Sequence, residues 1–263
     1  MEIFDSIILG LTQGLTEFIP VSSSGHLVLL QNLLSGASDH LFLEFINVGT
    51  LLALVIFFRK KIWQILVDVF KNKNYKLARN IIITSIPAGI IGFLLAGFIS
   101  ENPFFGSVIT VTVALAVVGI LMLILEKLPR ASTVKDGSEL SPWRALIIGL
   151  AQSVALIPGV SRSGATIITG RFAGLSPKES AEYSFLASIP IFLGVCLKMF
   201  ITDSDYLVAN LPTLALSNLV AFGAGMLAIG FMLKYLEKRD LKIFGIYRIA
   251  LAAVVIVLSL VLV

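Results

Sequence analysis

The chain has 263 residues, of which 57% are hydrophobic and only 14% are charged, with a mean hydropathy of +0.97. This composition excludes an ordinary soluble domain and predicts a polytopic membrane protein, with one integral membrane domain over residues 1–263. The net charge of +4 requires no nucleic-acid partner, because the basic residues fall almost entirely in predicted loops, and a single cysteine excludes an intrachain disulfide.

Six uninterrupted apolar segments approach or reach the roughly 20 residues that a helix needs to cross a bilayer. In chain order they are 41–58, 80–100, 107–126, 182–200, 213–233 and 244–263. Two further apolar stretches, 5–33 and 145–168, are interrupted by proline and serine. Each of these two is therefore either a kinked crossing or a hairpin that enters and leaves at one face.

The distribution of Lys and Arg decides between these two alternatives. If both interrupted stretches are hairpins, all loop Lys and Arg residues fall on one side of the membrane, at 59–79, 127–144, 171–178 and 234–242. Residues 1–58 and the connections 101–106 and 201–212 contain none. Because basic loops stay in the cytoplasm, we expect the hairpin arrangement, with both chain termini outside.

The order of hairpins and crossings predicts an internal duplication. A hairpin followed by three crossings makes an odd number of crossings, so a second copy of the unit enters the membrane upside down. We therefore expect an all-α fold of two inverted-topology repeats, about 1–128 and 140–263. Each repeat is a re-entrant helical hairpin plus three transmembrane helices.

One polar pattern occurs in both interrupted stretches. The first copy reads QGLTEFIPVSSSGH from Gln13, and the second contains Gln152 followed by PGVSRSGAT from Pro158. Both copies run from Gln to the first Ser in nine residues. Carboxylate, serine and arginine side chains are costly in hydrocarbon, so they are expected to line a polar cavity.

The spacing of the first copy predicts a helix that breaks and restarts. Gln13 and Glu17 are four residues apart and share a helical face, Pro20 interrupts the helix, and Ser22 to Ser24 are candidates to cap a second helix. The second copy repeats this plan. Two half-helix N-termini that converge form a site for an anion, most naturally phosphate.

The two copies differ in chemistry. When the first copy is shifted by 139 residues, Arg162 takes the place of Ser23, whereas Glu17 and His26 have only apolar counterparts. One half thus supplies a carboxylate and an imidazole, and the other a guanidinium. Arginine binds phosphate in a bidentate manner, and the remaining groups suit phosphoryl transfer.

Both motifs resemble the signature segments of the undecaprenyl-diphosphate phosphatase, or bacitracin-resistance, family of bacterial inner-membrane proteins, and the similarity covers essentially the whole chain. The resemblance implies hydrolysis of undecaprenyl or another polyprenyl diphosphate to the monophosphate and inorganic phosphate. This reaction recycles the cell-wall lipid carrier and confers bacitracin resistance. The resemblance also implies a divalent cation, Mg²⁺ or Ca²⁺. The expected partners are the diphosphate lipid and membrane lipids, and a homodimer is left open.

The resemblance also implies site residues. The catalytic set is Glu17, Ser23, His26 and Arg162, and the substrate-binding set is Gln13, Ser22, Ser161, Ser163 and Thr166. Glu17 is the expected metal ligand. Gln13 stands where many relatives have a second glutamate, so substrate phosphates are expected to complete the metal site. We assign Arg162 to diphosphate clamping, His26 to acid–base work and Ser23 to nucleophilic attack, with attack by water left open.

Other interpretations remain open at the sequence level. Inverted repeats with broken helices are typical of transporters, so a flippase for a phosphate-bearing lipid is the alternative function, and an ion channel is a weaker one. Intramembrane glutamines often join helices, and serines often only cap them. Lys198 and Arg248 lie near predicted span ends, where we expect their side chains to reach the membrane surface.

Overall fold

The computed structural model describes residues 3–34, 39–128 and 132–261, and these residues form helices joined by short connections, without a strand. The terminal residues 1–2 and 262–263, whose side of the membrane was predicted, lie outside the described residues, as does Arg130 of the basic set. The prediction of an all-α polytopic membrane protein is confirmed.

The helices of the first half are α1 (Ile3–Phe18), α2 (Ser23–Leu34), α3 (His40–Phe45), α4 (Asn47–Phe57), α5 (Arg59–Phe70), α6 (Lys76–Leu94), α7 (Ala96–Glu101), α8 (Pro103–Gly106) and α9 (Val108–Leu125). The helices of the second half are α10 (Pro142–Val154), α11 (Arg162–Phe172), α12 (Pro177–Thr202), α13 (Ser204–Ala209), α14 (Leu211–Leu236) and α15 (Lys242–Val261).

Four helices in the described part of the chain, α6, α9, α12 and α14, are long and apolar enough to cross a membrane. A fifth crossing results if 41–57 and α5, which meet at a 68° bend, form one broken span. The structure differs from the sequence prediction in three details. The segment 41–58 is divided at Ile46, and the segment 80–100 is divided at Leu95 between α6 and α7. Part of the basic loop 59–79 is the helix α5, because its apolar residues recur at helical spacing.

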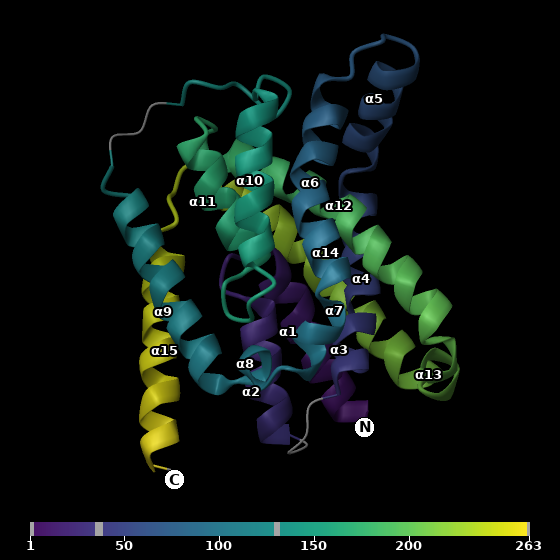
Figure 1. The fold of residues 1–263 in the computed structure, drawn as a ribbon, viewed down its shortest axis with the longest axis vertical. Helices are drawn as coiled ribbons and strands as arrows, with labels where there is room; N and C mark the ends of the chain where they lie inside the picture. The colour runs from purple at the N-terminus through teal and green to yellow at the C-terminus, as the bar shows by residue number, and fades with distance from the viewer. Residues whose placement is uncertain (1–2, 35–38, 129–131, 262–263) are drawn as a thin grey trace.

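The interrupted stretches form two helical hairpins. In Figure 1, α1 rises from the end where the N-terminus lies and α2 returns to it, whereas α10 and α11 enter and leave at the opposite end. The C-terminus lies at the same end as the N-terminus, and α5 lies at the other. The hairpins therefore meet inside the molecule from opposite ends.

Small residues let helices of the two halves approach closely. Helix α1 packs along α14, α10 packs along α6, and α9 packs along α15. A Cβ atom on Gly10 would lie 2.4 Å from the Ser217 carbonyl oxygen, and one on Gly149 would lie 2.6 Å from that of Thr84. These contacts leave no room for a side chain, as is common in membrane helix pairs.

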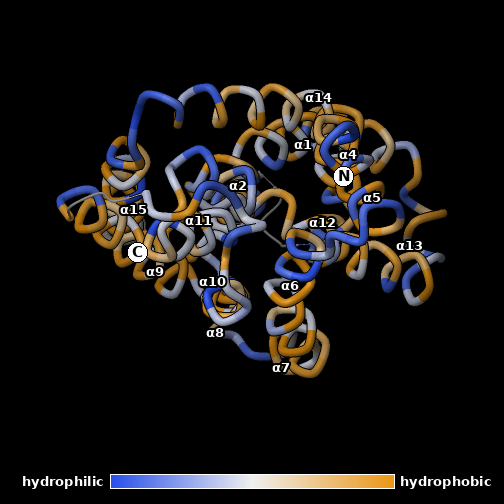
Figure 2. Tube along the Cα trace, turned by 90° about the horizontal axis from the view of Figure 1, so that it is seen from above, coloured by the Kyte–Doolittle hydropathy of each residue, from blue (hydrophilic) through white to orange (hydrophobic). Residues whose placement is uncertain are grey.

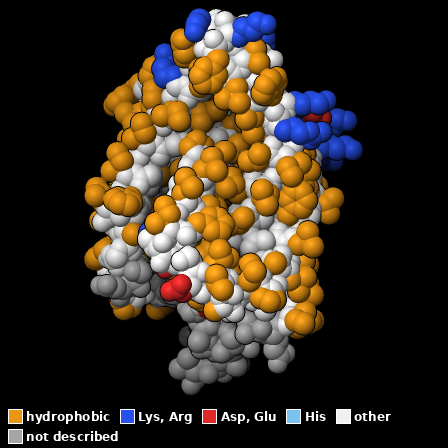
Figure 3. Space-filling model, turned by 90° about the vertical axis from the view of Figure 1, so that its right-hand side faces the viewer, with side chains coloured by type: hydrophobic (Ala, Val, Ile, Leu, Met, Phe, Trp, Pro, Cys, Tyr) orange, Lys and Arg blue, Asp and Glu red, His pale blue; other side chains and the backbone are white. Residues whose placement is uncertain are grey.

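The outer surface is apolar over most of its height. Figure 3 shows hydrophobic side chains over this face, with Lys and Arg gathered near the upper end. The hydropathy colouring of the trace agrees, because the helical segments are mostly hydrophobic and the hydrophilic stretches concentrate at connections (Figure 2). Trp63 and Trp143 are exposed in α5 and at the start of α10, beside the basic segments, where interfacial tryptophans are expected.

Candidate functional site

The site begins with two serines that occupy matching backbone positions in the hairpin turns. Ser22 and Ser161 both have a φ of 74°, a conformation that costs energy for residues other than glycine. The Ser22 hydroxyl accepts a hydrogen bond from the Gly25 amide at 3.3 Å, and the Ser161 hydroxyl accepts one from the Gly164 amide at 3.1 Å. Both serines therefore cap the helices that restart after the break, as predicted.

The two turns lie against each other. A Cβ atom on Gly25 would lie 3.7 Å from the Gly159 Cα, and the Ser163 hydroxyl donates to the Glu17 carbonyl oxygen at 3.2 Å. The N-terminal ends of α2 and α11 are thus brought to one place. Such ends attract anions because their first amide groups have no partner within the helix.

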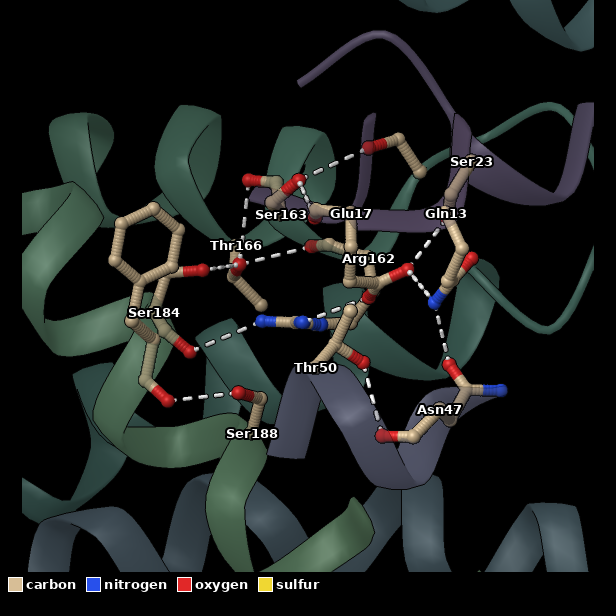
Figure 4. A network of polar contacts seen from close by, with 12 residues as sticks. Gln13, Glu17, Ser23, Asn47, Thr50, Arg162, Ser163, Thr166, Ser184 and Ser188 are labelled. Atoms are coloured by element: carbon tan, nitrogen blue, oxygen red, sulfur yellow. Dashed lines mark hydrogen bonds and ion pairs between the residues drawn. The ribbon is translucent and has the colours of Figure 1, made fainter. Parts of the chain in front are cut away.

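Glu17 and Arg162 form an ion pair across these turns. An Arg162 Nη atom donates to one Glu17 carboxylate oxygen at 2.9 Å, and the side chains of Arg162 and Glu17 are only 14% and 9% exposed, respectively. A buried pair carries a large desolvation cost, which good geometry and additional hydrogen bonds must offset. Figure 4 shows the guanidinium at the centre of a wider polar network.

The second carboxylate oxygen of Glu17 accepts two further hydrogen bonds. The Ser23 hydroxyl donates to it at 2.5 Å, and the Gln13 side-chain amide donates to it at 3.1 Å. Gln13 also donates to the Asn47 side-chain oxygen at 2.7 Å, which connects α1 to α4. Ser23 is thus bonded through its hydroxyl to the same carboxylate that pairs with Arg162.

Helix α12 supports Arg162 from the other side. The guanidinium donates to the Ser184 carbonyl oxygen at 3.4 Å, and its central carbon lies 5.0 Å from the centre of the Phe192 ring. The Thr166 hydroxyl lies 2.5 Å from the Ser184 hydroxyl and donates to the Arg162 carbonyl oxygen at 2.8 Å. Thr166 therefore fixes the backbone that carries the arginine.

His26 lies beside this network without joining it. Within the described residues its ring nitrogens contact the Ser22 carbonyl oxygen at 2.8 Å and the Tyr247 hydroxyl at 2.7 Å. The rings of His26 and Tyr247 also stack on each other. The predicted residues therefore divide into two groups. One contains Gln13, Glu17, Ser23, Arg162, Ser163 and Thr166, with Ser22 and Ser161 as caps, and the other is His26 with its partner on α15.

Sequence reasoning missed the residues that α4 and α12 contribute. Asn47, Ser184 and Phe192 contact the site, and Thr50 and Ser188 extend its polar surroundings (Figure 4). A signal was present, because Ser184 and Ser188 are four residues apart within an apolar segment and thus share one helical face.

Arg248 corrects another expectation. Its side chain does not reach the membrane surface but is 0% exposed, and it donates to backbone carbonyl oxygens of both turns. The expectation was wrong because α15 packs on α9 with Arg248 facing inward. The proximity of residue 248 to a span end says nothing about which face it occupies.

The described residues do not form a metal site by themselves. They contain no group of three or more His, Cys, Asp and Glu side chains that could hold an ion. Both Glu17 oxygens already accept hydrogen bonds from Arg162, Ser23 and Gln13. Divalent cations such as Mg²⁺ and Ca²⁺ need several oxygen ligands, so one carboxylate is too few.

Two cavities open elsewhere, where basic residues gather. They have volumes of about 720 and 700 Å³, and Lys178 and Glu237 line both. Glu17 and Arg162 line neither cavity, although they form the polar cluster. We assign the site from the chemistry of the buried cluster, because cavity size alone does not identify reacting groups.

The fold and this cluster define a class of protein, namely a polytopic helical membrane protein with a buried carboxylate, guanidinium and serine between two broken helices. A family model described as "Bacitracin resistance protein BacA" matches residues 6–254. The chain belongs to this family.

Three curated relatives match along almost their whole length. "Undecaprenyl-diphosphatase 1" of Clostridioides difficile is 40% identical over 270 residues, which cover 97% of this chain and 96% of the relative. "Undecaprenyl-diphosphatase" of Korarchaeum cryptofilum is 38% identical, with 94% and 95% covered. "Undecaprenyl-diphosphatase" of Methylobacillus flagellatus is 36% identical, with 95% and 96% covered.

Proposed function

We propose that the protein is an integral membrane phosphatase that hydrolyses undecaprenyl diphosphate to undecaprenyl monophosphate and inorganic phosphate. The observation that carries this proposal is the Glu17 carboxylate, which accepts from Arg162 at 2.9 Å and from Ser23 at 2.5 Å at the meeting point of two helix N-termini. The family match and the names of the relatives agree with it. The bacitracin-resistance role and the inner-membrane location are those of the family.

Arg162 is proposed to bind the diphosphate. Its guanidinium pairs with Glu17 and lies beside the N-terminus of α11, so an incoming phosphate finds a cation and free amide groups together. We propose that the phosphate replaces the carboxylate as the partner of the guanidinium. This exchange of partners keeps the buried guanidinium paired with an anion, which lowers the cost of separating it from Glu17.

Ser23 is proposed to attack the terminal phosphorus once Glu17 is released. Glu17 takes the hydroxyl proton, an Oγ–P bond forms, and the P–O bond to the bridging oxygen breaks, which frees the lipid monophosphate. Water then cleaves the phosphoserine and releases inorganic phosphate. Direct attack by water with Glu17 as the base gives the same products and is the alternative that the experiments must separate.

His26 is proposed to act as the acid. It lies on the first turn of α2, so it shares a backbone segment with Ser22 and Ser23, and the Tyr247 hydroxyl holds its outer ring nitrogen. A proton delivered to the bridging oxygen would assist departure of the monophosphate. Gln13, Ser163 and Thr166 are proposed to position these groups rather than to react.

A divalent cation is proposed to arrive with the diphosphate rather than to reside in the protein. This form of the proposal agrees with the single carboxylate at the site, because the substrate oxygens supply the missing ligands. Such an ion would neutralise part of the phosphate charge. A homodimer is the remaining partner proposal.

We also propose the finer topology, with inverted repeats and both termini outside. Reciprocal contacts support the repeats: Asn218 accepts from the Gly49 amide at 2.6 Å, and Ser85 donates to the Ala187 carbonyl oxygen at 2.9 Å. Each pair joins the second span of one half, α14 or α6, to the first span of the other half, α4 or α12. The basic residues at the end opposite the termini support the orientation.

The first experiment measures inorganic phosphate released from undecaprenyl diphosphate by the purified protein, with Mg²⁺ or Ca²⁺ and with chelator. We expect metal-dependent release by the wild-type protein. Arg162→Ala and Glu17→Gln are each expected to reduce kcat/KM by about 10²–10³-fold, because each removes a buried charged partner of the reacting groups. Arg144→Ala, at an exposed position, is the control and should retain activity.

Two results would contradict the proposal. Near-wild-type phosphate release by folded Arg162→Ala would contradict the proposal that Arg162 binds the diphosphate. No release by folded wild-type protein with any of several divalent cations would favour the transporter alternative, which a flipping assay with a fluorescent polyprenyl diphosphate in vesicles would then examine. Equal release with and without chelator would exclude the cation.

A further inference from the structure

The C-terminal helix places one buried cation against the two hairpin turns. Arg248 of α15 is fully buried, and the structure gives its guanidinium no carboxylate partner in the described part of the chain. All of its bonds go to backbone carbonyl oxygens: Leu115 at 3.4 Å, Pro20 at 3.2 Å, Ala114 at 3.4 Å, Gly159 at 2.5 Å and Val160 at 3.1 Å.

Two of these carbonyl groups are equivalent positions of the repeated motif. Pro20 lies two residues before the capping Ser22, and Gly159 lies two residues before the capping Ser161. One Nη atom of Arg248 donates to Pro20 and the other donates to Gly159. A single planar fork with two terminal nitrogens therefore connects the same point of both turns, whereas a lysine ammonium is one nitrogen on a flexible stem and would not hold the two carbonyl groups at a fixed separation.

Burial of an unpaired guanidinium is costly, so the bonds it makes must be needed locally. The turn residues at the helix breaks leave carbonyl groups without helical partners, and no water reaches them in hydrocarbon. Arg248 satisfies these groups and at the same time attaches both turns to the middle of α9, through Ala114 and Leu115. The relative position of the turns thus depends on one side chain.

We propose that Arg248 is a positioning residue for the hydrolysis: it sets the separation of the two turns and thereby places Ser23 and Glu17 of the first hairpin against Arg162 of the second. This proposal rests on the proposed function. Those three side chains come from different hairpins, so a shift of the turns by about 1 Å would misalign them and cost on the order of 10²-fold in rate. The affinity for the lipid tail would change little when Arg248 is replaced.

The first test is structural and independent of activity. Spin labels are attached at positions 24 and 154, through Ser24→Cys and Val154→Cys in a Cys196→Ser background, because both positions are exposed and flank the two turns. Pulsed electron resonance then gives the distance distribution between them. We expect a narrow distribution with Arg248 and a shifted or broader one with Arg248→Met and with Arg248→Lys.

The second test is kinetic. We expect kcat to fall at least about tenfold in Arg248→Met and in Arg248→Lys, with KM changed less than about twofold, when rates are divided by the fraction of folded protein. The lysine variant retains the positive charge, so a reduced kcat in this variant shows that the two-nitrogen geometry of the guanidinium, and not its charge, is needed. Arg239→Met, at an exposed position just before α15, is the control and should match wild type.

Gly119→Ala tests the same idea with Arg248 intact. An added Cβ would lie 2.9 Å from the Gly245 carbonyl oxygen and 3.2 Å from the Arg248 Cβ, so α15 must move away from α9. We expect altered label distances and reduced kcat here as well, and this variant keeps the proposal testable if Arg248→Met does not fold.

Unchanged distances together with wild-type kcat per folded molecule in the Arg248 and Gly119 variants would overturn the proposal. Loss of folded protein with wild-type kcat in the remaining fraction would also overturn it, because the arginine would then serve stability alone. Absence of hydrolysis by wild-type protein would instead contradict the proposed function, while the distance measurement would still decide whether Arg248 sets the turns.

Discussion

The pairing of Glu17 with Arg162 places two opposite charges where neither would be stable alone. Each would carry a large desolvation cost in the membrane interior, and their 2.9 Å contact offsets part of it. In the proposed reaction, a diphosphate that takes the guanidinium leaves the carboxylate free to accept a proton, so binding and activation would be linked.

Replacement of Ser23 separates the two proposed nucleophiles. We expect Ser23→Ala to reduce kcat by at least about 10³-fold if the hydroxyl attacks phosphorus, since its removal eliminates the reacting group. Acid quenching of wild-type protein with substrate labelled in the terminal phosphate should then trap labelled phosphoserine, and the variant should not be labelled.

Ser24→Ala is the matched control, because Ser24 is the adjacent exposed hydroxyl and contacts only Ser22 among the described residues. It should retain activity and labelling. A modest loss in Ser23→Ala, of about tenfold, with no label in the wild type would identify water as the attacking group.

Helix pairs α1–α14 and α10–α6 explain how the two hairpins are held in the molecule. Both contacts run along small residues, so the backbones approach and dispersion contacts accumulate over several turns. Each hairpin is thereby fixed by a long helix of the other half of the chain. The site is consequently built from both halves.

Gly10→Ala tests this packing at the element scale. The added methyl group would lie 2.4 Å from the backbone oxygen of Ser217, which has no side-chain freedom to yield. We expect a loss of about 1–3 kcal/mol in stability from overpacking, together with reduced activity, measured as a lower Tm in detergent.

Gly223→Ala on α14 is the control, since nothing lies within 4 Å of the place that an added Cβ would take and alanine favours the helix. An equal Tm decrease in both variants would show that the close approach of α1 and α14 at Gly10 is not the cause of the loss.

At the scale of the whole molecule, positive charge is concentrated at one end. Lys and Arg gather at the end of the molecule opposite the two termini (Figures 1 and 3). In the proposed topology, retention of the basic loops in the cytoplasm would set the orientation of every helix, and of the hairpins with them.

Labelling in intact cells tests this orientation. An impermeant maleimide should label Asp205→Cys, in α13, and should label Asn74→Cys, in the basic connection between α5 and α6, only after lysis; both positions are exposed. The native Cys196 is buried, so the unmodified protein serves as the blank. Labelling of Asn74→Cys alone in intact cells would show that the orientation is the reverse of the proposed one.

Some residues of the candidate site were predictable from the sequence, and others were not. The cost of polar groups in hydrocarbon indicated a site at the two motifs, and the resemblance of these motifs to a known family assigned Glu17, Ser23 and Arg162. The structure brings these three side chains together. His26 was assigned by the same reasoning and lies beside Tyr247 instead. Phe192 was missed because phenylalanine is common in an apolar helix, and Asn47 because a single amide there is expected to join helices rather than to mark a site.

The sequence by itself determined the class of the protein, its helices and the two broken segments, because hydrophobic length and helix breakers act locally. Tertiary structure alone decided which side chains meet. The Glu17–Arg162 contact joins residues 145 positions apart, and Arg248 reaches Pro20 across 228. Such contacts depend on which helix faces pack, and in a membrane that choice rests on close backbone approach rather than on hydrophobic pattern.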